Sequence, residues 1–369
     1  MQAYSAVSPP VVAARRDALR ASMQERGARL FLSEAMPDIR YYTGCMDAGG
    51  TLLIDAEGRA TVLTNAHDAP QAIAEAIDTE VRVSFPNEDA GALLVEALRE
   101  QSGPVLTPGL SAARHLWLLA QGCDVRMEPG ITSHLRRVKE PGELALIRQA
   151  ARIVETGMAA AHAALRPGVR EIEVAAEAEL AMRRAGMDGR IFETKVESGP
   201  RSAMPSTYAG QRMLEAGDLV LIDIGPAFQG YFGDLTRTFA VGEPAPAARD
   251  LLAVVLAAQA AGIAAVREGV TGHDVDEAAR IPIRKAGLEA GFRHNTGHSL
   301  GLAGDSLPLI APGSRSPLRA GECITVEPGA YVEGVGGVRI EDEILVTPDG
   351  CEVITSFPKT RSDLIVSLP

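Results

Sequence analysis

The amino-acid sequence predicts an α+β protein made of two domains. The chain has 369 residues, which is more than one hydrophobic core usually serves. Helix-like and strand-like segments alternate in the first third, whereas after residue 142 two long helical patterns come before runs of strands. We therefore expect a smaller α/β domain at residues 1–136 and a larger α+β domain at residues 137–369.

The first domain is predicted element by element from periodicity and turn residues. VVAARRDALRASMQERG has helical apolar spacing and ends at Gly27, and the strand-like ARLFLS follows. GTLLIDAEGRATVLT predicts a β-hairpin whose turn spans residues 55–58. QAIAEAI, VRVSF, ALLVEALRE and PVLTP continue the alternation. Residues 129–142, PGITSHLRRVKEPG, carry a Pro-Gly pair at each end and are interpreted as the interdomain linker.

The second domain opens with two helical patterns. ELALIRQAARIVETGMAAAHAAL has apolar residues at helical spacing, and EIEVAAEAELAMRRAG follows it. His162 inside the first pattern is interpreted as a packing residue. From residue 218 the chain reads mostly as strands and turns, with helices expected near 247–268 and 272–290. The apolar run 251–266 is interpreted as a core helix, with an interface between two copies of the chain as the alternative.

Composition limits the classes of function. Asp and Glu outnumber Lys and Arg by 48 to 36, so no nucleic-acid partner is expected. The apolar run 251–266 stops short of a membrane span, and no membrane partner is expected. The first residues lack the long apolar region of a secretory signal, and the four cysteines form no CxxC pair. We therefore expect a cytoplasmic protein with reduced cysteines.

Two aspartates lie in DLVLIDIGPAFQGYFGDLTRTFAVG, which predicts two strands joined at Gln229-Gly230. If those two residues form the turn, positions whose numbers sum to 459 face each other, so Asp223 pairs with Thr236. Asp223 and Asp234 then lie on one sheet face, roughly 7–8 Å apart at the backbone. A slip of one residue would move Asp234 to the opposite face, and both acids would be ordinary solvent-facing strand residues in the alternative interpretation.

Two glutamates and a histidine extend this pattern. Glu327 ends an apolar strand in CITVEPG, and Glu341 lies within VRIEDEILV, two residues after Arg339 on the same strand face. HNTGHSLGLAGDS at 294–306 places His294 and His298 four residues apart, a spacing that alone is weak evidence. Two aspartates, two glutamates and one histidine form an oxygen-rich ligand set that suits a pair of divalent cations.

These motifs resemble the metallopeptidase family M24, the creatinase, prolidase and aminopeptidase P group. The resemblance rests on LIDIG with GDLTRTF eleven residues later, GHSLGL, VEPG and VRIEDEILV, and it covers nearly the whole chain. YYTG at 41–44 resembles the family's N-terminal domain, and KEPGELALIRQA resembles the start of its catalytic domain. The resemblance implies a pita-bread catalytic domain at 137–369, preceded by a creatinase-type α/β domain at 1–136.

The resemblance also implies roles for individual residues. The family's five metal ligands fall on the acids and the histidine just described, namely Asp223, Asp234, His298, Glu327 and Glu341. Two divalent ions are expected, Mn²⁺ first, with Co²⁺, Zn²⁺ or Fe²⁺ as alternatives. Catalytic roles are expected for Glu327, which would relay a proton, for His294, which would contact substrate, and for Arg339, which would orient Glu341. Thr236 is expected to hydrogen-bond Asp223.

The sequence departs from the family at two positions. Members that cleave next to proline carry histidines where this chain has Ser206 and Asp305. With Tyr231, these two residues are the expected substrate contacts, although Asp305 could equally be a solvent-facing loop acid. Exchanging a potential cation for a hydroxyl and a carboxylate changes the local field where an oxyanion would form.

The resemblance implies a dinuclear metallohydrolase resembling Xaa-Pro dipeptidases and aminopeptidases, with a metal-bound hydroxide attacking an amide of a small peptide. The alternative is a creatinase-like hydrolase or lyase that acts on a small amide or another non-peptide metabolite in a changed pocket. A non-catalytic binding protein on the same fold is the third possibility. A homodimer is expected from the resemblance alone.

Overall fold

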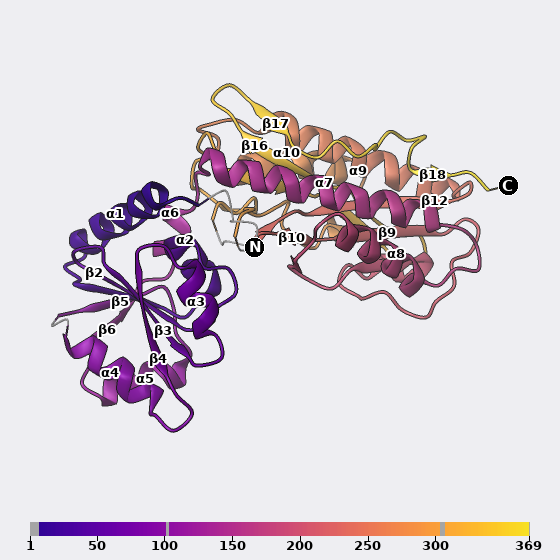
Figure 1. Ribbon diagram of the computed structural model, residues 1–369. Coiled ribbons are helices and arrows are strands. Elements are labelled where there is room, and N and C mark those ends of the chain that lie inside the picture. Colours follow the sequence, from indigo (N-terminus) through magenta and orange to yellow (C-terminus); the bar gives the residue numbers. More distant parts are fainter. Residues whose placement is uncertain (1–6, 101–102, 303–306, 369) are drawn as a thin grey trace. The chain divides into compact units, whose positions relative to one another are not determined.

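The structure, a computed structural model, describes residues 7–100, 103–302 and 307–368. The chain divides into two compact units, residues 1–136 and 137–369. Figure 1 shows the elements of both. The first unit contains α1 (Pro9–Glu25), β1 (Leu30–Ser33), α2 (Met36–Thr43), β2 (Thr51–Asp55), β3 (Ala60–Asn65), α3 (Ala69–Glu75), β4 (Thr79–Ser84), α4 (Ala90–Glu100), β5 (Val105–Thr107), α5 (Ala112–Ala120), β6 (Val125–Met127) and α6 (Ile131–Leu135).

The first unit is built on a mixed six-stranded sheet in the order β4-β3-β2-β1-β5-β6. The predicted β2–β3 hairpin is present, and the carboxylate of Asp55 accepts the backbone N–H groups of Glu57 and Arg59 across its turn. Gly58 adopts φ +85° in this turn, where residues other than glycine are disfavoured. β1 lies inside the sheet, and Leu30 and Leu32 belong to the core of this unit.

Helix α2 was not predicted, because its two adjacent tyrosines resemble strand residues more than an amphipathic helix. Its ends nevertheless carry helix signals. Pro37 lies in the first turn, and Gly44 ends the helix with φ +74°.

The segment 129–142, expected to be a linker, is more structured than that term implies. It contains α6, and its two central arginines are buried in separate units. Arg136 forms an ion pair with Asp38 in the first unit, whereas Arg137 Nε donates to Glu322 Oε1 over 2.6 Å in the second. A buried guanidinium requires such a partner, so the basic residues stabilise both flanking units.

The second unit carries four small sheets and four helices in the part that the structure describes, with strand orders β18-β12-β9-β8, β11-β10-β7, β13-β16-β17 and β14-β15. Its elements are α7 (Pro141–Ala164), α8 (Glu171–Arg184), β7 (Gly189–Arg190), β8 (Lys195–Ser198), the 3₁₀ turn η1 (Gly199–Ala203), β9 (Leu219–Ile224), β10 (Pro226–Phe228), β11 (Tyr231–Phe232), β12 (Leu235–Val241), α9 (Pro246–Ala265), α10 (Gly272–Lys285), the 3₁₀ turn η2 (Glu289–Gly291), β13 (Cys323–Val326), β14 (Gly329–Val332), β15 (Gly336–Arg339), β16 (Asp342–Val346), β17 (Cys351–Val353) and β18 (Ile365–Val366).

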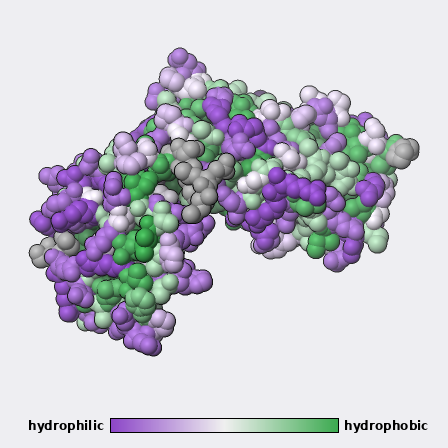
Figure 2. Space-filling model, viewed as in Figure 1, coloured by the Kyte–Doolittle hydropathy of each residue, from purple (hydrophilic) through white to green (hydrophobic). Residues whose placement is uncertain are grey.

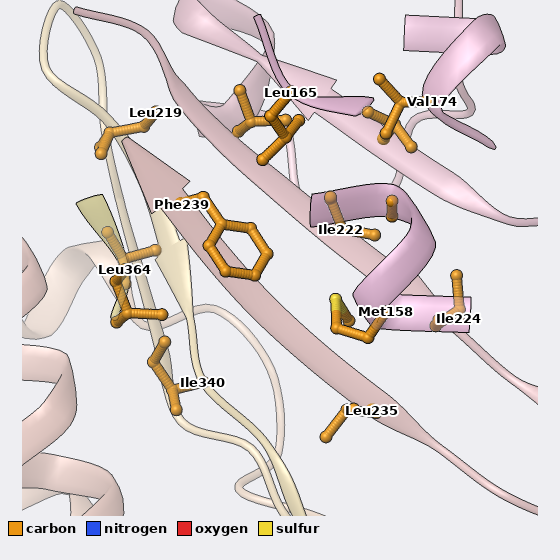
Figure 3. Packing of buried hydrophobic residues seen from close by; sticks show 14 of the residues in the cluster. Met158, Leu165, Val174, Leu219, Ile222, Ile224, Leu235, Phe239, Ile340 and Leu364 are labelled. Carbon is orange, nitrogen blue, oxygen red and sulfur yellow. The ribbon is translucent and has the colours of Figure 1, made fainter. Parts of the chain in front are cut away.

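The α7 helix lies against the strands that carry the two predicted aspartates. It contacts β9, β10, β11 and β12. Figure 3 shows Phe239 of β12 among Met158 of α7, Ile222 of β9 and Leu364. The ring of His162 lies 4.9 Å from that of Phe239, in agreement with its interpretation as a packing residue. This apolar layer packs the hairpin against α7.

A glycine permits the closest approach between α7 and the hairpin. A Cβ atom on Gly233 would lie 2.8 Å from the carbonyl oxygen of Ala150 in α7, which is too short for a non-bonded contact. The absence of a side chain therefore lets the chain pass over the helix backbone immediately before Asp234.

The apolar helix α9 corrects one expectation. It has 20 residues and is long and apolar enough to cross a membrane by length and composition, so the run is not too short for a span. However, Leu251, Leu252 and Val255 are buried in the core of the second unit. Core helices satisfy the same length test, and the buried face supports the interpretation of α9 as one of them.

Hydrophilic and hydrophobic residues are interspersed on the visible surface of each unit in Figure 2. Exposed apolar side chains such as Ile73 and Leu116 are expected singly on any folded surface. The four cysteines are all unpaired, in agreement with the sequence.

Candidate metal centre

The predicted hairpin register is confirmed. Asp223 in β9 faces Thr236 in β12, and Ala227 faces Phe232 nearer the turn, so the paired numbers sum to 459 as expected. Gln229 and Gly230 adopt φ +50° and +77°, the left-handed values required at both central positions of a type I′ turn. Asp223 and Asp234 are both buried.

The two glutamates lie later in the chain than the aspartates, one before β14 and one after β15. Glu327 follows β13, and its backbone N–H donates to the carbonyl of Thr296. Glu341 lies between β15 and β16, and its N–H donates to the carbonyl of Thr236 on the aspartate hairpin. This bond and the donation from Arg237 to the carbonyl of Glu341 tie Glu341 to β12, the strand that follows Asp234.

His298 faces these acids from an extended segment, not from a helix. Its Nε2 lies 3.5 Å from Asp234 Oδ2 and 3.3 Å from Glu327 Oε1. Its Nδ1 lies 3.0 Å from the carbonyl oxygen of Ser299, and donation there would leave the Nε2 lone pair facing the carboxylates. Gly297 is required beside it, because a Cβ would lie 2.0 Å from the carbonyl oxygen of Thr325.

One group of possible ligand atoms is compact. Single ligand atoms of Asp234, His298 and Glu341 all lie within 4.8 Å of one another. The side chain of Glu327 is adjacent and 17% exposed, so it lies nearer to solvent than the fully buried Glu341. Glu327 is further oriented by Thr325, whose hydroxyl donates to Glu327 Oε1.

The carboxylates repel one another at the centre. Burial raises the pKa of Asp234 well above its usual value, and the charges of Glu341, Asp223 and Glu327 raise it further. Burial likewise raises the pKa of Glu341, with Glu327 and Asp223 adding to the effect. Glu341 Oε1 is buried with no hydrogen-bond donor. A divalent cation would satisfy this oxygen and offset the repulsion, so the donor set fits a metal.

Asp223 has a different environment from the other acids. Its Oδ2 accepts from Arg339 Nη2 at 2.5 Å and from Lys195 Nζ at 2.9 Å. Burial alone would raise the pKa of Asp223, but the charges of Arg339 and Lys195 outweigh burial and lower it. Lys195 was not identified from the sequence, because its pairing with the strand of Asp223 comes from the fold.

Two expected side-chain contacts are wrong. Thr236 Oγ1 donates to Glu341 Oε2 over 2.7 Å and not to Asp223. Arg339 bonds Asp223 directly and is linked to Glu341 through Thr236, whose Oγ1 accepts from Arg339 Nε over 3.2 Å. The two orienting residues are therefore exchanged. The cause is the docking of the β15–β16 connection against β12, where the N–H of Glu341 donates to the carbonyl of Thr236 and its carboxylate meets the hydroxyl of Thr236.

Arg339 also connects Asp223 to His294. Its Nη1 donates to the hydroxyl of Tyr331 over 2.7 Å, and this hydroxyl lies 3.0 Å from His294 Nε2. Burial raises the pKa of Tyr331 to about 12, so the phenol stays protonated at neutral pH. Burial lowers the pKa of His294, so its ring is mainly neutral at pH 7. His294 therefore joins the centre through a hydrogen-bonded chain.

Glu343 is a further acid that the sequence analysis missed. It is fully buried in β16, and its Oε1 accepts the backbone N–H of Asp234 over 2.8 Å. Burial raises its pKa well above the usual value. The sequence signal was an acid inside the apolar run that follows Glu341. Its contact fixes the backbone from which Asp234 projects.

Comparison with known proteins follows the same division of the chain. The model of metallopeptidase family M24 matches residues 145–348, and that of the creatinase/prolidase N-terminal domain matches residues 15–113. The first match covers more than half of the chain. The chain belongs to metallopeptidase family M24. The predicted pita-bread α+β fold with a creatinase-type N-terminal domain is confirmed. Membership implies divalent metal ions at the centre.

Individual M24 relatives agree with this assignment. The chain is 40% identical over 225 residues to the uncharacterized peptidase YqhT of Bacillus subtilis, covering 61% of this chain and 64% of that protein. It is 37% identical to an Xaa-Pro dipeptidase of Pyrococcus horikoshii, over 63% of this chain and 65% of the relative. These alignments therefore span less than two thirds of either relative.

A solved structure covers more of the fold. The Xaa-Pro dipeptidase from Bacillus anthracis superposes with a TM-score of 0.90 at 32% identity, covering 96% of this chain and all of that one, 100%. Both units of this M24 protein thus have counterparts in that structure.

The expected substrate contacts are placed less clearly. Ser206 is exposed on the loop after η1. Tyr231 is only 2% exposed, and its hydroxyl donates to Glu143 Oε1 in α7, so the structure gives it a packing contact where a substrate contact was expected. Asp305 lies outside the described residues.

Proposed function

We propose that this M24 protein is a divalent-metal-dependent peptidase that hydrolyses the amide bond before proline in dipeptides. The observation that carries the proposal is the compact set of ligand atoms from Asp234, His298 and Glu341, with Asp223 and Glu327 beside it. Two of the proteins it resembles, from P. horikoshii and B. anthracis, are named Xaa-Pro dipeptidases. The substrate is carried over from them as part of the proposal.

Five residues are proposed as metal ligands. They combine buried carboxylate oxygens with a single imidazole, a donor set that suits Mn²⁺, with Co²⁺, Zn²⁺ or Fe²⁺ as alternatives. Burial and mutual repulsion favour exchanging protons for metal ions at these acids. The proposed ligands are Asp223, Asp234, His298, Glu327 and Glu341.

A bound divalent ion lowers the pKa of a water molecule and polarises an amide carbonyl. Glu327 is the acid best placed to accept the water's proton, because its carboxylate is the more exposed of the two glutamates. Both ring nitrogens of His294 already have partners, Nδ1 at the carbonyl of Asn295 and Nε2 at the hydroxyl of Tyr331, so a substrate would have to displace one of them to bond to this ring. Arg339 acts indirectly, since its guanidinium positions Asp223 and Tyr331.

The remaining properties rest on composition and resemblance. We propose a homodimer located in the cytoplasm, with no nucleic-acid or membrane partner. The net charge of −12 supports the exclusion of nucleic acid. The unpaired cysteines support a reducing compartment.

The test is initial-rate hydrolysis of Xaa-Pro dipeptides and Xaa-Pro-Yaa tripeptides by the Mn²⁺-loaded protein. Asp234→Asn serves as the inactive comparison, because it replaces a proposed ligand carboxylate with an amide of the same shape. We expect dipeptide turnover that falls by at least about 100-fold in the variant, because losing a residue that merely orients a metal ligand already costs about 10–100-fold. Turnover equal in the two proteins would contradict the proposal.

A second candidate keeps the metal centre and changes the substrate to a small non-peptide amide or a related metabolite. The observation that favours it is Ser206, an exposed hydroxyl where proline-directed members carry a histidine. A folded, metal-loaded protein that hydrolyses no peptide of the panel would favour this candidate. A non-catalytic binding protein would instead keep its partner in Asp234→Asn.

A further inference from the structure

Among the residues that the structure describes, Lys195 is a cation at the centre to which the proposed chemistry assigns no role. It opens β8 and lies directly opposite Asp223 in the neighbouring strand β9. Its ammonium is 2.9 Å from Asp223 Oδ2, and its side chain is only 19% exposed. The ammonium also lies 4.5 Å from the centre of the Phe192 ring, a cation–π contact. Lys195 is thus fixed at the centre, not extended into solvent.

The two cations make the proposed ligands unequal. Arg339 and Lys195 both bond to Asp223 Oδ2, so a metal ion at this carboxylate would lie beside two positive charges. In contrast, Asp234, His298 and Glu341 present ligand atoms to one another within 4.8 Å, and Asp223 is not a member of that group among the described residues. The end formed by Asp234, His298 and Glu341 is therefore open to a metal ion. At the other end, Asp223 already binds two positively charged side chains.

The charge count favours the same conclusion. When ionised, the four proposed carboxylate ligands carry four negative charges, and Lys195 and Arg339 place two positive charges beside Asp223. The two charges that remain are balanced by one divalent ion. A second divalent ion would lie beside an ammonium and a guanidinium, and like charges repel strongly where water is excluded.

We propose that Lys195 adapts this centre to a single tightly held divalent ion, bound at the end formed by Asp234, His298, Glu327 and Glu341. A second ion binds only when the Lys195 ammonium leaves Asp223. The inference rests on the proposed metal centre and assigns to Lys195 a difference in affinity between its two ions.

The experiment measures Mn²⁺ binding to the intact, metal-stripped protein. Isothermal titration calorimetry and equilibrium dialysis with elemental analysis give the number of sites and their affinities. The wild type should bind one Mn²⁺ tightly and a second at least about tenfold more weakly. Lys195→Met keeps the length of the side chain without its charge, and the second site should tighten by about tenfold or more.

A conservative variant separates charge from packing. Lys195→Arg retains the positive charge and should bind Mn²⁺ as the wild type does. Electron paramagnetic resonance gives an independent result, because only two adjacent Mn²⁺ ions produce an exchange-coupled spectrum. At two equivalents of Mn²⁺, that spectrum should be strong in Lys195→Met and weak in the wild type and in Lys195→Arg.

Failure of this inference differs from failure of the proposed metal centre. Two equally tight sites in both the wild type and Lys195→Met would overturn the role of Lys195 and leave the metal centre intact. No Mn²⁺ binding by the wild type would overturn the centre itself. If Lys195→Met loses its circular dichroism spectrum, Lys195→Gln takes its place, and unchanged binding in that folded variant overturns the inference.

Discussion

The side chain of Glu341 illustrates how a metal site is held together before it contains a metal. One oxygen accepts from Thr236 Oγ1, and the other is buried without a donor. Burial and the charges of Glu327 and Asp223 raise the pKa of Glu341 well above its usual value. Without a cation, burial and these charges favour the neutral, protonated form of this carboxyl group over an unpaired buried charge.

This state makes Glu341→Gln an informative variant. An amide resembles a protonated carboxyl, so in a chelator the variant should be as stable as the wild type or more stable. With excess Mn²⁺ the wild type should gain about 2.7 kcal/mol at a metal concentration 100 times its Kd, and the variant much less. Thermal unfolding with EDTA and with Mn²⁺ measures both values.

The matched control is Glu352→Gln, a glutamate on β17 of the same unit that forms an exposed ion pair with Arg148. Its response to Mn²⁺ should equal that of the wild type. An equal Mn²⁺ gain in Glu341→Gln would show that Glu341 is not a ligand.

The sequence predicted which residues lie at the centre, but not which of them bond to one another. The register of the hairpin follows from its two-residue turn, so the placement of Asp223 opposite Thr236 was predictable. The exchange of partners between Thr236 and Arg339 was not predictable. It depends on how β15 and β16 dock against β12, and these strands are 95 or more residues away from β12 in the chain. Lys195 escaped notice for the same reason, since a lone lysine on a strand is usually solvated.

At the scale of elements, the centre depends on one close contact between a helix and a strand connection. Gly233 passes over the backbone of α7 at Ala150, and Asp234 follows immediately. The backbone of Asp234 is fixed from the other side by Glu343. Long periodic helices such as α7 and α9 were predictable from sequence, whereas a contact that only a missing side chain permits has no signature in periodicity.

Gly233→Ala tests this contact. The added methyl would lie 2.8 Å from the Ala150 carbonyl oxygen, so either the helix or the hairpin must shift. Overpacking of this kind costs about 1–3 kcal/mol, and we expect that loss in the free energy of unfolding measured by urea denaturation. Mn²⁺ affinity should also fall, since Asp234 moves with its neighbour.

Gly350→Ala is the control, because a Cβ there would meet nothing within 4 Å. Its unfolding free energy should remain within about 0.5 kcal/mol of that of the wild type. A Gly233→Ala protein as stable as Gly350→Ala would mean that α7 and the hairpin can separate at no cost.

At the scale of the whole molecule, the two units have separate cores and unequal chemistry. Leu30, Leu94 and Leu118 belong to the core of the first unit, and Val154, Ile222 and Phe239 to that of the second. All five proposed ligands lie in the second unit, between residues 223 and 341. A bound metal therefore stabilises the second unit directly.

Scanning calorimetry with and without Mn²⁺ tests this separation. We expect two unfolding transitions, of which only that of the second unit moves with Mn²⁺. A metal concentration 100 times the Kd contributes about 2.7 kcal/mol, which corresponds to a rise of about 5–10 °C for a unit of this size. Asp234→Asn assigns the transition, because its shift with Mn²⁺ should vanish. If both transitions rose equally, or if a single transition carried the whole enthalpy, the two units would be coupled more tightly than their separate cores imply.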